Sequence, residues 1–473
     1  MIRKHAIVAL GLALPCLATA AAADQGKQWL AGDHHVHSRF SVGLNMDKYP
    51  PEPIFGGDGL YPIPMNALMA RRFGLDWIAA TDHGGPNHSK ISLERTYPEL
   101  VLSRELVPDV IQFLALELNS PGADHRSLII PHGHGEAERL YDLEHRFDKR
   151  EIWPPDSSRD NPERMLEMLR EQQAEERKPL VIAHHPSRSA NEPPDYGLYT
   201  PGEFRDWNDA APDVAVGMEG APGRQAIGLY PDGTPGRDQP RGRYRRHPTH
   251  GGFDYMTARL GGLWDTRLGE GRRWWITANS DSHIHYTEGG NDFWPGEFTK
   301  TYVWAERDPD AIMEAIRAGR IFVTTGDLVS ELFLTVRAGE RSASMGGELV
   351  IEPGATVEVE IRFLDPEGTN HGGRNPSVNR VDLIVGQVLG RAEDREADLN
   401  PTTRVERRAG PGDWTRDGDY AVIRHRLENV DAPLYVRVRG TSTEELEPEP
   451  DPHGEDPWAD LWFYSNPIFI RPG

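Results

Sequence analysis

The sequence has little cysteine and little positive charge. One cysteine, Cys16, occurs in 473 residues, and it lies in the apolar N-terminal segment, so the rest of the chain has no disulfide and no thiolate to offer a metal ion. Lys and Arg number 52 against 74 Asp and Glu, which gives a net charge of −22. This sign is unfavourable for contacts with nucleic acid or an anionic membrane, so we predict that the protein binds neither.

The sequence also lacks an apolar run long enough to cross a membrane. Residues 6–20 are apolar but shorter than the ~20 residues that a spanning helix needs. A basic start precedes them and small residues up to Ala23 follow, which is the pattern of a cleaved secretory signal. We therefore predict a signal peptide over residues 1–23, a periplasmic or secreted mature chain and no membrane partner after cleavage. Lipid attachment at Cys16 is the less favoured alternative, because Pro15 precedes it.

Residues 24–332 alternate short β-branched apolar runs with polar helical stretches, which is typical of a parallel α/β architecture. The predicted strands cover residues 75–80, 111–118, 127–130, 179–183, 214–218 and 274–278. Predicted helices cover residues 161–177 and 308–318, and residues 230–252 predict a long loop. Residues 333–473 instead alternate with period two between Gly, Pro and Asn turns, which predicts an antiparallel β-sandwich domain.

Histidine is abundant and clustered. Fifteen of the nineteen histidines lie between His34 and His285, in groups that also hold carboxylates. Histidine is the commonest metal ligand, and packing gives a chain little reason to place so many beside aspartates. The clusters therefore predict a metal site made of imidazole and carboxylate.

The spacing within two clusters supports this interpretation. His35 and His37 are two residues apart, so on a strand both rings lie on one face and can hold one ion. Asp33 shares that parity, as a ligand or as an acceptor that orients an imidazole. Asp281 and His283 repeat the spacing, and Glu117 and His185 stand alone at strand ends.

Taken in order, these motifs resemble the polymerase and histidinol phosphatase (PHP) domain superfamily. They are Asp33-x-His35-x-His37-Ser38, Thr81-Asp82-His83, Glu117, His125, His185-Pro186 and Ser280-Asp281-Ser282-His283. The later segments 301–304 and 319–326 resemble its secreted branch, which includes carbaryl hydrolase-like enzymes. The resemblance implies a distorted (β/α)7 barrel that holds two or three divalent metal ions, in enzymes that mostly cleave phosphoesters.

The resemblance also implies the ligands. His35, His37 and Asp281 would hold one metal, Glu117 would bridge to a second, and His125 and His185 would complete the second site. His83 and His283 would hold a third metal where present. The chain departs from the pattern at Val42, where the family often has an aspartate, and His132, His134 and His184 remain alternatives to the assigned ligands. Zn, Mn and Fe all suit such ligands.

These inferences predict an exported hydrolase that cleaves the phosphoester of a small organic substrate with a metal-bound hydroxide. Asp33 is a candidate catalytic residue, and Arg188 and Arg39 are candidates to clamp the phosphate. The chain has no Gly-x-Ser-x-Gly and no P-loop motif, which disfavours a serine hydrolase and a P-loop nucleotidase. Two alternatives stay open: a carboxyl ester, carbamate or amide hydrolase with the same metal centre, and a non-catalytic metal or glycan binding protein.

Overall fold

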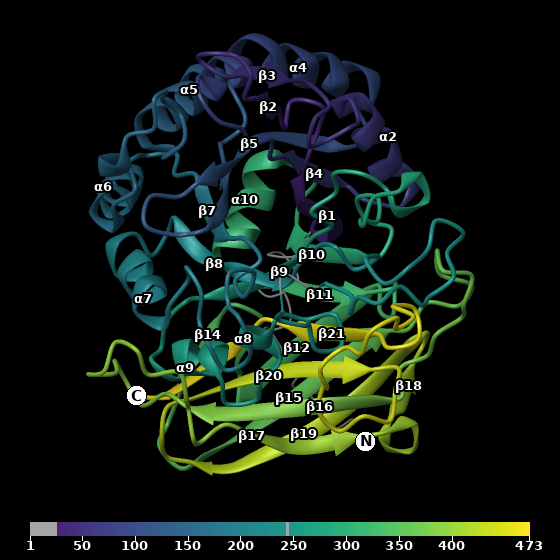
Figure 1. Cartoon of the computed structure of the whole chain (residues 1–473). Helices are drawn as coiled ribbons and strands as arrows, with labels where there is room; N and C mark the ends of the chain where they lie inside the picture. The colour runs from purple at the N-terminus through teal and green to yellow at the C-terminus, as the bar shows by residue number, and fades with distance from the viewer. Residues whose placement is uncertain (1–25, 243–245) are drawn as a thin grey trace, which may run out of the picture.

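The computed structural model describes residues 26–242 and 246–473, so the predicted signal peptide and Cys16 lie outside the described residues. The first part of the chain forms a strongly curved sheet with helices around it (Figure 1). Its strands are β1 (Gln28–Val36), β4 (Trp77–Ala80), β5 (Ile111–Asn119), β6 (His125–Ile129), β7 (Leu180–Ala183), β8 (Ala215–Ala221), β9 (Trp275–Ala278), β10 (Thr299–Ala305) and β11 (Ile321–Thr325). A separate hairpin consists of β2 (Gly43–Asn45) and β3 (Glu52–Ile54).

The helices of this part are α2 (Ile63–Arg72), α3 (His88–Ile91), α4 (Tyr97–Leu106), α5 (Glu136–Phe147), α6 (Pro162–Gln173), α7 (Pro201–Ala210), α8 (Tyr255–Ala258), α9 (Leu263–Gly269) and α10 (Pro309–Arg317). The two helices predicted from the sequence correspond to α6 and α10. In α10 the Asp308 side chain caps the first turn by accepting a hydrogen bond from the Ala311 amide at 3.0 Å, and Gly319 follows the helix with a φ of +68°. None of the described helices is long and apolar enough to cross a membrane.

The directions of the strands determine which strand ends lie at the same edge of the sheet. β1, β4 and β5 run parallel to one another, and so do β7, β8 and β9. β6 lies between β5 and β7 and is antiparallel to both, which differs from the purely parallel arrangement that the sequence predicts. The carboxyl ends of the six parallel strands and the amino end of β6 therefore lie along one edge of the sheet.

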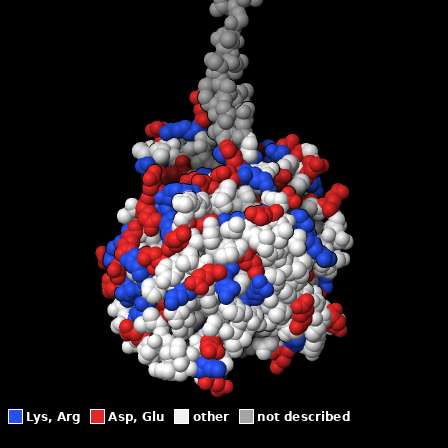
Figure 2. Space-filling view, turned by 90° about the horizontal axis from the view of Figure 1, so that it is seen from above, with Lys and Arg blue, Asp and Glu red and all other residues white. Residues whose placement is uncertain are grey.

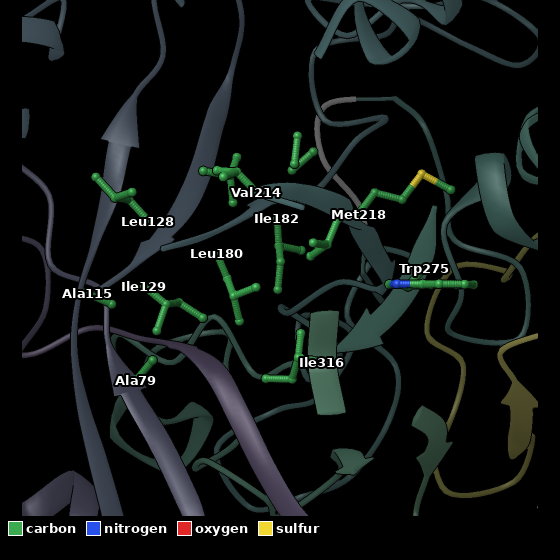
Figure 3. Close-up of a cluster of buried hydrophobic side chains, with 14 of the residues drawn as sticks. Ala79, Ala115, Leu128, Ile129, Leu180, Ile182, Val214, Met218, Trp275 and Ile316 are labelled. Atoms are coloured by element: carbon green, nitrogen blue, oxygen red, sulfur yellow. The ribbon is translucent and has the colours of Figure 1, made fainter. Parts of the chain in front are cut away.

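The core lies inside the curve of this sheet and is closed by α10 (Figure 3). Apolar side chains from neighbouring strands meet Ile316 of α10 there; they include Ala79, Ala115, Ile129, Leu180, Ile182 and Trp275. Burial of this apolar surface is the main stabilising term. The polar residues at the strand ends lie outside this core, at the shared edge.

A closed barrel is not confirmed. The backbone ladder of the sheet follows the open order β14-β22-β20-β21-β11-β10-β1-β4-β5-β6-β7-β8-β9. β1 and β9 come together only past their ends, where Val36 and Ser282 form an isolated bridge and the His37 amide donates to the Ser282 carbonyl at 3.0 Å. Deeper in the sheet, Thr301 of β10 fills the gap by bonding both backbone groups of Ala278 through its side-chain oxygen.

The C-terminal part consists largely of antiparallel strands, as predicted, although β14 and β22 pair in parallel. Its strands are β12 (Glu331–Ala338), β13 (Arg341–Ser344), β14 (Glu348–Ile351), β15 (Ala355–Leu364), β16 (Arg380–Gln387), β17 (Arg404–Ala409), β18 (Thr415–Asp417), β19 (Tyr420–Val430), β20 (Leu434–Thr441), β21 (Trp462–Ser465) and β22 (Ile468–Pro472). The five-stranded sheet β13-β12-β15-β19-β18 shares one apolar core with β16, β20 and β22. β21 also pairs with β11, so the large sheet runs across the predicted boundary at residue 332, and the domain division itself stays a prediction.

Candidate metal centre

The shared edge of the curved sheet gathers most of the predicted ligands. His35 and His37 come at the end of β1, His83 follows β4, and Glu117 lies near the end of β5. His125 is the first residue of β6, and because β6 runs in the opposite direction, it reaches the same edge. His185 follows β7, and Asp281 and His283 follow β9. In open α/β sheets, ligands bind at the carboxyl ends of the strands.

The first group of donor atoms is His35, His37 and Asp281. The Nε2 atoms of the two histidines are 3.0 Å apart. Asp281 places its Oδ1 atom 2.9 Å from His35 Nε2 and 3.2 Å from His37 Nε2. One ligand atom from each residue therefore lies within 4.8 Å of the others, and all three residues are buried.

The second group surrounds Glu117. Its Oε1 atom lies 2.8 Å from His125 Nδ1 and 3.0 Å from His185 Nε2, and its Oε2 atom lies 3.5 Å from His83 Nε2. The same carboxylate is also 3.5 Å from His35 Nε2 and 3.4 Å from His37 Nε2. Glu117 thus lies between the two groups of donor atoms.

A third group includes a residue that the sequence analysis missed. Asp58 Oδ2 lies 3.0 Å from His83 Nε2 and 3.4 Å from His283 Nε2, and His37 completes the set. The resemblance left this group short of an acid, because Val42 stands where an aspartate is usual. Asp58 supplies the carboxylate from a loop after the β2–β3 hairpin.

Neighbouring polar groups orient the histidines. The Nδ1 atom of His35 lies 2.7 Å from Glu219 Oε1, and that of His37 lies 2.7 Å from Ser41 Oγ. His283 donates from Nδ1 to the carbonyl of Asp281 at 2.9 Å. Since each Nδ1 atom is engaged, the Nε2 lone pairs face the centre, which is how metal-binding histidines are held.

Of the three alternative histidines, only His184 lies beside the predicted ligands. His184 Nδ1 lies 3.0 Å from Glu117 Oε1, as close as His185, and the His184 ring stacks on His35 with centroids 3.5 Å apart. His184 therefore remains an alternative ligand. His132 and His134 follow the other end of β6, so the structure does not bring them to the edge where His125 lies.

Asp33 is buried beneath the cluster and bonds backbone groups. It accepts hydrogen bonds from the His35 amide at 3.0 Å and from the Ser280 amide at 2.9 Å. Burial raises the pKa of Asp33 to about 7. The structure therefore places Asp33 as a link between the ends of β1 and β9 and not against an imidazole.

The two predicted phosphate clamps differ in position. Arg188 forms a salt bridge with Asp124, so it lies between the segments that carry His125 and His185. Arg39 forms a salt bridge with Glu99, and its guanidinium lies 5.2 Å from the Phe40 ring centroid. The hollow that Arg39 lines contains none of the predicted ligands among the described residues, so the structure does not bring Arg39 into the cluster.

The charges of the cluster fit divalent cations. Burial opposes ionisation of Glu117, but His125 and His35 hold its pKa well below the usual value. Burial lowers the pKa of His37 to about 3 and that of His125 to about 4. Despite burial, Asp281 raises the pKa of His35 well above the usual value. The surrounding carboxylates therefore favour a positive charge at this position. Neutral imidazoles and ionised carboxylates are the forms that bind metal.

Backbone strain also occurs at this edge. His185 and Asp281 have φ angles of +30° and +47°, a region that residues other than glycine rarely adopt. Such strain persists where the surrounding structure holds it and is concentrated at functional sites. The residues, charges and backbone together fit a centre that could hold metal ions.

No protein-family model and no curated protein matches the chain. Two of the solved structures that resemble it are of Endonuclease Q. One is a complex with a 27-mer duplex substrate with an abasic lesion at the active site, with a TM-score of 0.32 and 15% identity. The other is the lesion-specific enzyme from Pyrococcus furiosus, with a TM-score of 0.31 and 16% identity. Each match covers 62% of this chain and 56% of the solved chain, so the chain matches little more than half of their length.

The prediction of no nucleic-acid partner is contradicted by this comparison, because one of these neighbours carries a DNA duplex at its active site. That prediction used the net charge of the whole chain, which does not describe each part of the surface. Figure 2 shows basic side chains interspersed among acidic ones on one face of the molecule. The overall charge of −22 is therefore no basis for excluding such a partner.

Proposed function

We propose that this protein is a metal-dependent hydrolase of PHP type that cleaves the phosphoester of a small organic substrate. The observation that carries the proposal is the position of Glu117 between two donor groups, one with His35 and His37 and one with His125 and His185. Adjacent divalent ions lower the pKa of water and neutralise charge on a reacting phosphoryl group. The sequence pattern at residues 1–23 further supports export as part of this proposal.

The residues of the chain have distinct tasks in this proposal. His35, His37 and Asp281 would hold one ion, and Glu117 would join that group to the second. Glu219 and Ser41 keep the imidazoles turned toward the centre. These groups hold their positions by buried hydrogen bonds, so little reorganisation is needed when substrate binds.

At the rim, Arg188 is the candidate to contact the outer oxygens of the phosphoryl group. Its salt bridge with Asp124 holds the side chain beside the segments that carry His125 and His185. A planar guanidinium can bond two phosphoryl oxygens at once. Arg39 has no part in the proposal.

Metal content and turnover test the proposal together. The purified protein is loaded with Mn²⁺ or Zn²⁺, its bound metal is measured by mass spectrometry, and its rates are compared on an aryl phosphodiester, an aryl phosphomonoester and an aryl carboxyl ester. We expect bound metal, activity on a phosphoester, and loss of both in His35→Ala and Asp281→Ala. His453→Ala is the matched control, because His453 is exposed and pairs with Asp238 instead of a candidate ligand.

Two results would contradict the proposal. Activity confined to the carboxyl ester would assign the centre to another class of substrate. Wild-type metal content in both variants would remove His35 and Asp281 from the centre.

A further inference from the structure

A second hollow opens directly beside the candidate metal centre, with a volume of about 410 Å³. His83 belongs both to the donor set around Glu117 and to the wall of this hollow. The volume falls in the range of about 300–1,000 Å³ that is typical of small-molecule pockets. A molecule held here therefore reaches the metal centre at the His83 side.

The wall of this pocket is mainly apolar. Val42 and Leu44 contribute from β2 and the residue before it, and Ile152 and Trp153 contribute from the loop after α5. Trp153 is half-buried, so part of its ring system remains available to a ligand. Contact between two aromatic rings adds stabilising free energy to that which comes from burying their apolar surface.

Val42 is fixed against the metal centre. Its amide donates to the carbonyl of His83 at 3.1 Å, which places the valine side chain at the point where pocket and centre meet. The close packing depends on Gly84, because a Cβ atom there would lie 2.9 Å from Val42 Cγ2. Asp58 places a carboxylate beside His83, so residue 42 is not needed as an acid. Its valine side chain instead forms part of the apolar wall.

One cation stands at this pocket without a competing acid. Lys149 is engaged, since its Nζ atom donates to the Ala123 carbonyl at 2.7 Å and lies 3.3 Å from Asp160 Oδ1. Arg150 is exposed, and no carboxylate within the described residues forms a salt bridge with it. Its guanidinium is therefore available to an anionic ligand.

We propose that this pocket binds an aromatic group of the substrate, so that the enzyme acts on aryl esters of phosphate. This inference rests on the proposed function. The ring lies against Trp153 and Leu44, the ester bond lies at the His83 side, and Arg150 attracts the anion to the mouth. Val42, Trp153 and Arg150 are specificity-determining residues under this proposal.

The test compares two phosphomonoesters that differ in the organic part, 1-naphthyl phosphate and ethyl phosphate, by release of inorganic phosphate. In Trp153→Ala we expect KM for the naphthyl ester to rise about tenfold or more, while kcat/KM for the ethyl ester changes less than about twofold. Trp153→Phe keeps an aromatic ring and is expected to restore most of the loss. In Arg150→Ala, KM rises for both esters, and Arg426→Ala is the control, because Arg426 is an exposed arginine on β19.

A binding measurement separates the pocket from the chemistry. Titration of 1-naphthol into the metal-loaded protein, followed by tryptophan fluorescence, is expected to show binding that Trp153→Ala weakens about tenfold and Trp153→Phe retains. Equal losses on both esters in Trp153→Ala, or naphthol binding that Trp153→Ala leaves unchanged, would overturn the aromatic pocket. Cleavage of a DNA oligonucleotide at a rate above that of both esters, unaffected by Trp153→Ala, would also overturn it.

The two proposals fail in different ways. If the protein binds metal but hydrolyses neither ester, the proposed function fails, while naphthol binding still decides whether the pocket takes an aromatic ring. If both esters are hydrolysed with equal efficiency by the wild type, the proposed function stands and the inference about the pocket fails.

Discussion

The replacement Glu219→Gln tests whether a residue outside the three donor groups described above controls the candidate metal centre. Glu219 is fully buried; its Oε1 atom lies 2.7 Å from His35 Nδ1, and its Oε2 atom accepts a hydrogen bond from the His185 amide. Glutamine keeps the shape but has one acceptor atom where the carboxylate has two. If the glutamine oxygen faces His35, the glutamine side-chain nitrogen faces the His185 backbone N–H. Two hydrogen-bond donors then face each other in a buried site.

The size of the effect follows from these contacts. Loss of an outer partner of a metal-binding histidine typically weakens metal affinity about 10- to 100-fold, which corresponds to about 1.4–2.7 kcal/mol. The unpaired His185 amide adds a loss of about 1–3 kcal/mol in the free energy of unfolding. Both effects are expected in one variant, because Glu219 contacts both segments.

The assay is a competition titration of Zn²⁺ or Mn²⁺ against a chelating dye, with urea unfolding of the same preparations. Glu144→Gln is the matched control, since Glu144 is buried and lies 2.6 Å from His88 Nδ1, outside the donor set. We expect both variants to lose stability and only Glu219→Gln to lose metal affinity. Unchanged affinity in a folded Glu219→Gln protein, or an equal loss in Glu144→Gln, would refute the reasoning.

Two further predictions concern packing and pH. In Gly223→Ala, the new Cβ atom would lie 2.2 Å from Asp281 Cβ, so we expect a loss of about 1–3 kcal/mol in urea unfolding and weaker metal binding in the dye titration; unchanged values for both would contradict the close approach. Despite burial, Glu144 raises the pKa of His88 from 6.5 to about 9. The pair therefore contributes about 3 kcal/mol to the free energy of unfolding; this contribution is complete below pH 6.5 and is lost as the pH rises through 9. Urea unfolding at pH 7 and pH 10 should show this loss in the wild type and a smaller one in His88→Gln, and equal losses would exclude the pair as its source.

The regular parts of the site could be predicted because they follow strand periodicity. His35 and His37 share a face of β1 and its continuation, and Glu117 and His185 lie where apolar runs end. Those runs bury their apolar residues in the core, so the polar residue that follows each run must emerge at an edge. The placement of Asp281 and His283 after β9 follows from the same rule.

The remaining parts depend on contacts that no local pattern records. Asp58 follows the β2–β3 hairpin in an irregular loop, and only the folded chain brings it to His83 and His283. Arg39 follows His37 by two residues but turns to Glu99 on α4, because the chain leaves the strand after Val36. The direction of β6 is likewise set by its neighbours, since a short apolar run carries no information about orientation.

The ladder between β11 and β21 makes the two halves of the molecule interdependent. A chain shortened to end at residue 332 would lose β21 and expose the backbone of β11, two strands away from the β1 strand that carries His35. Unpaired strand edges of this kind promote aggregation. Proteolytic trimming or a fusion that displaces the last strands would therefore reduce solubility and metal uptake together, although every candidate ligand lies earlier in the chain.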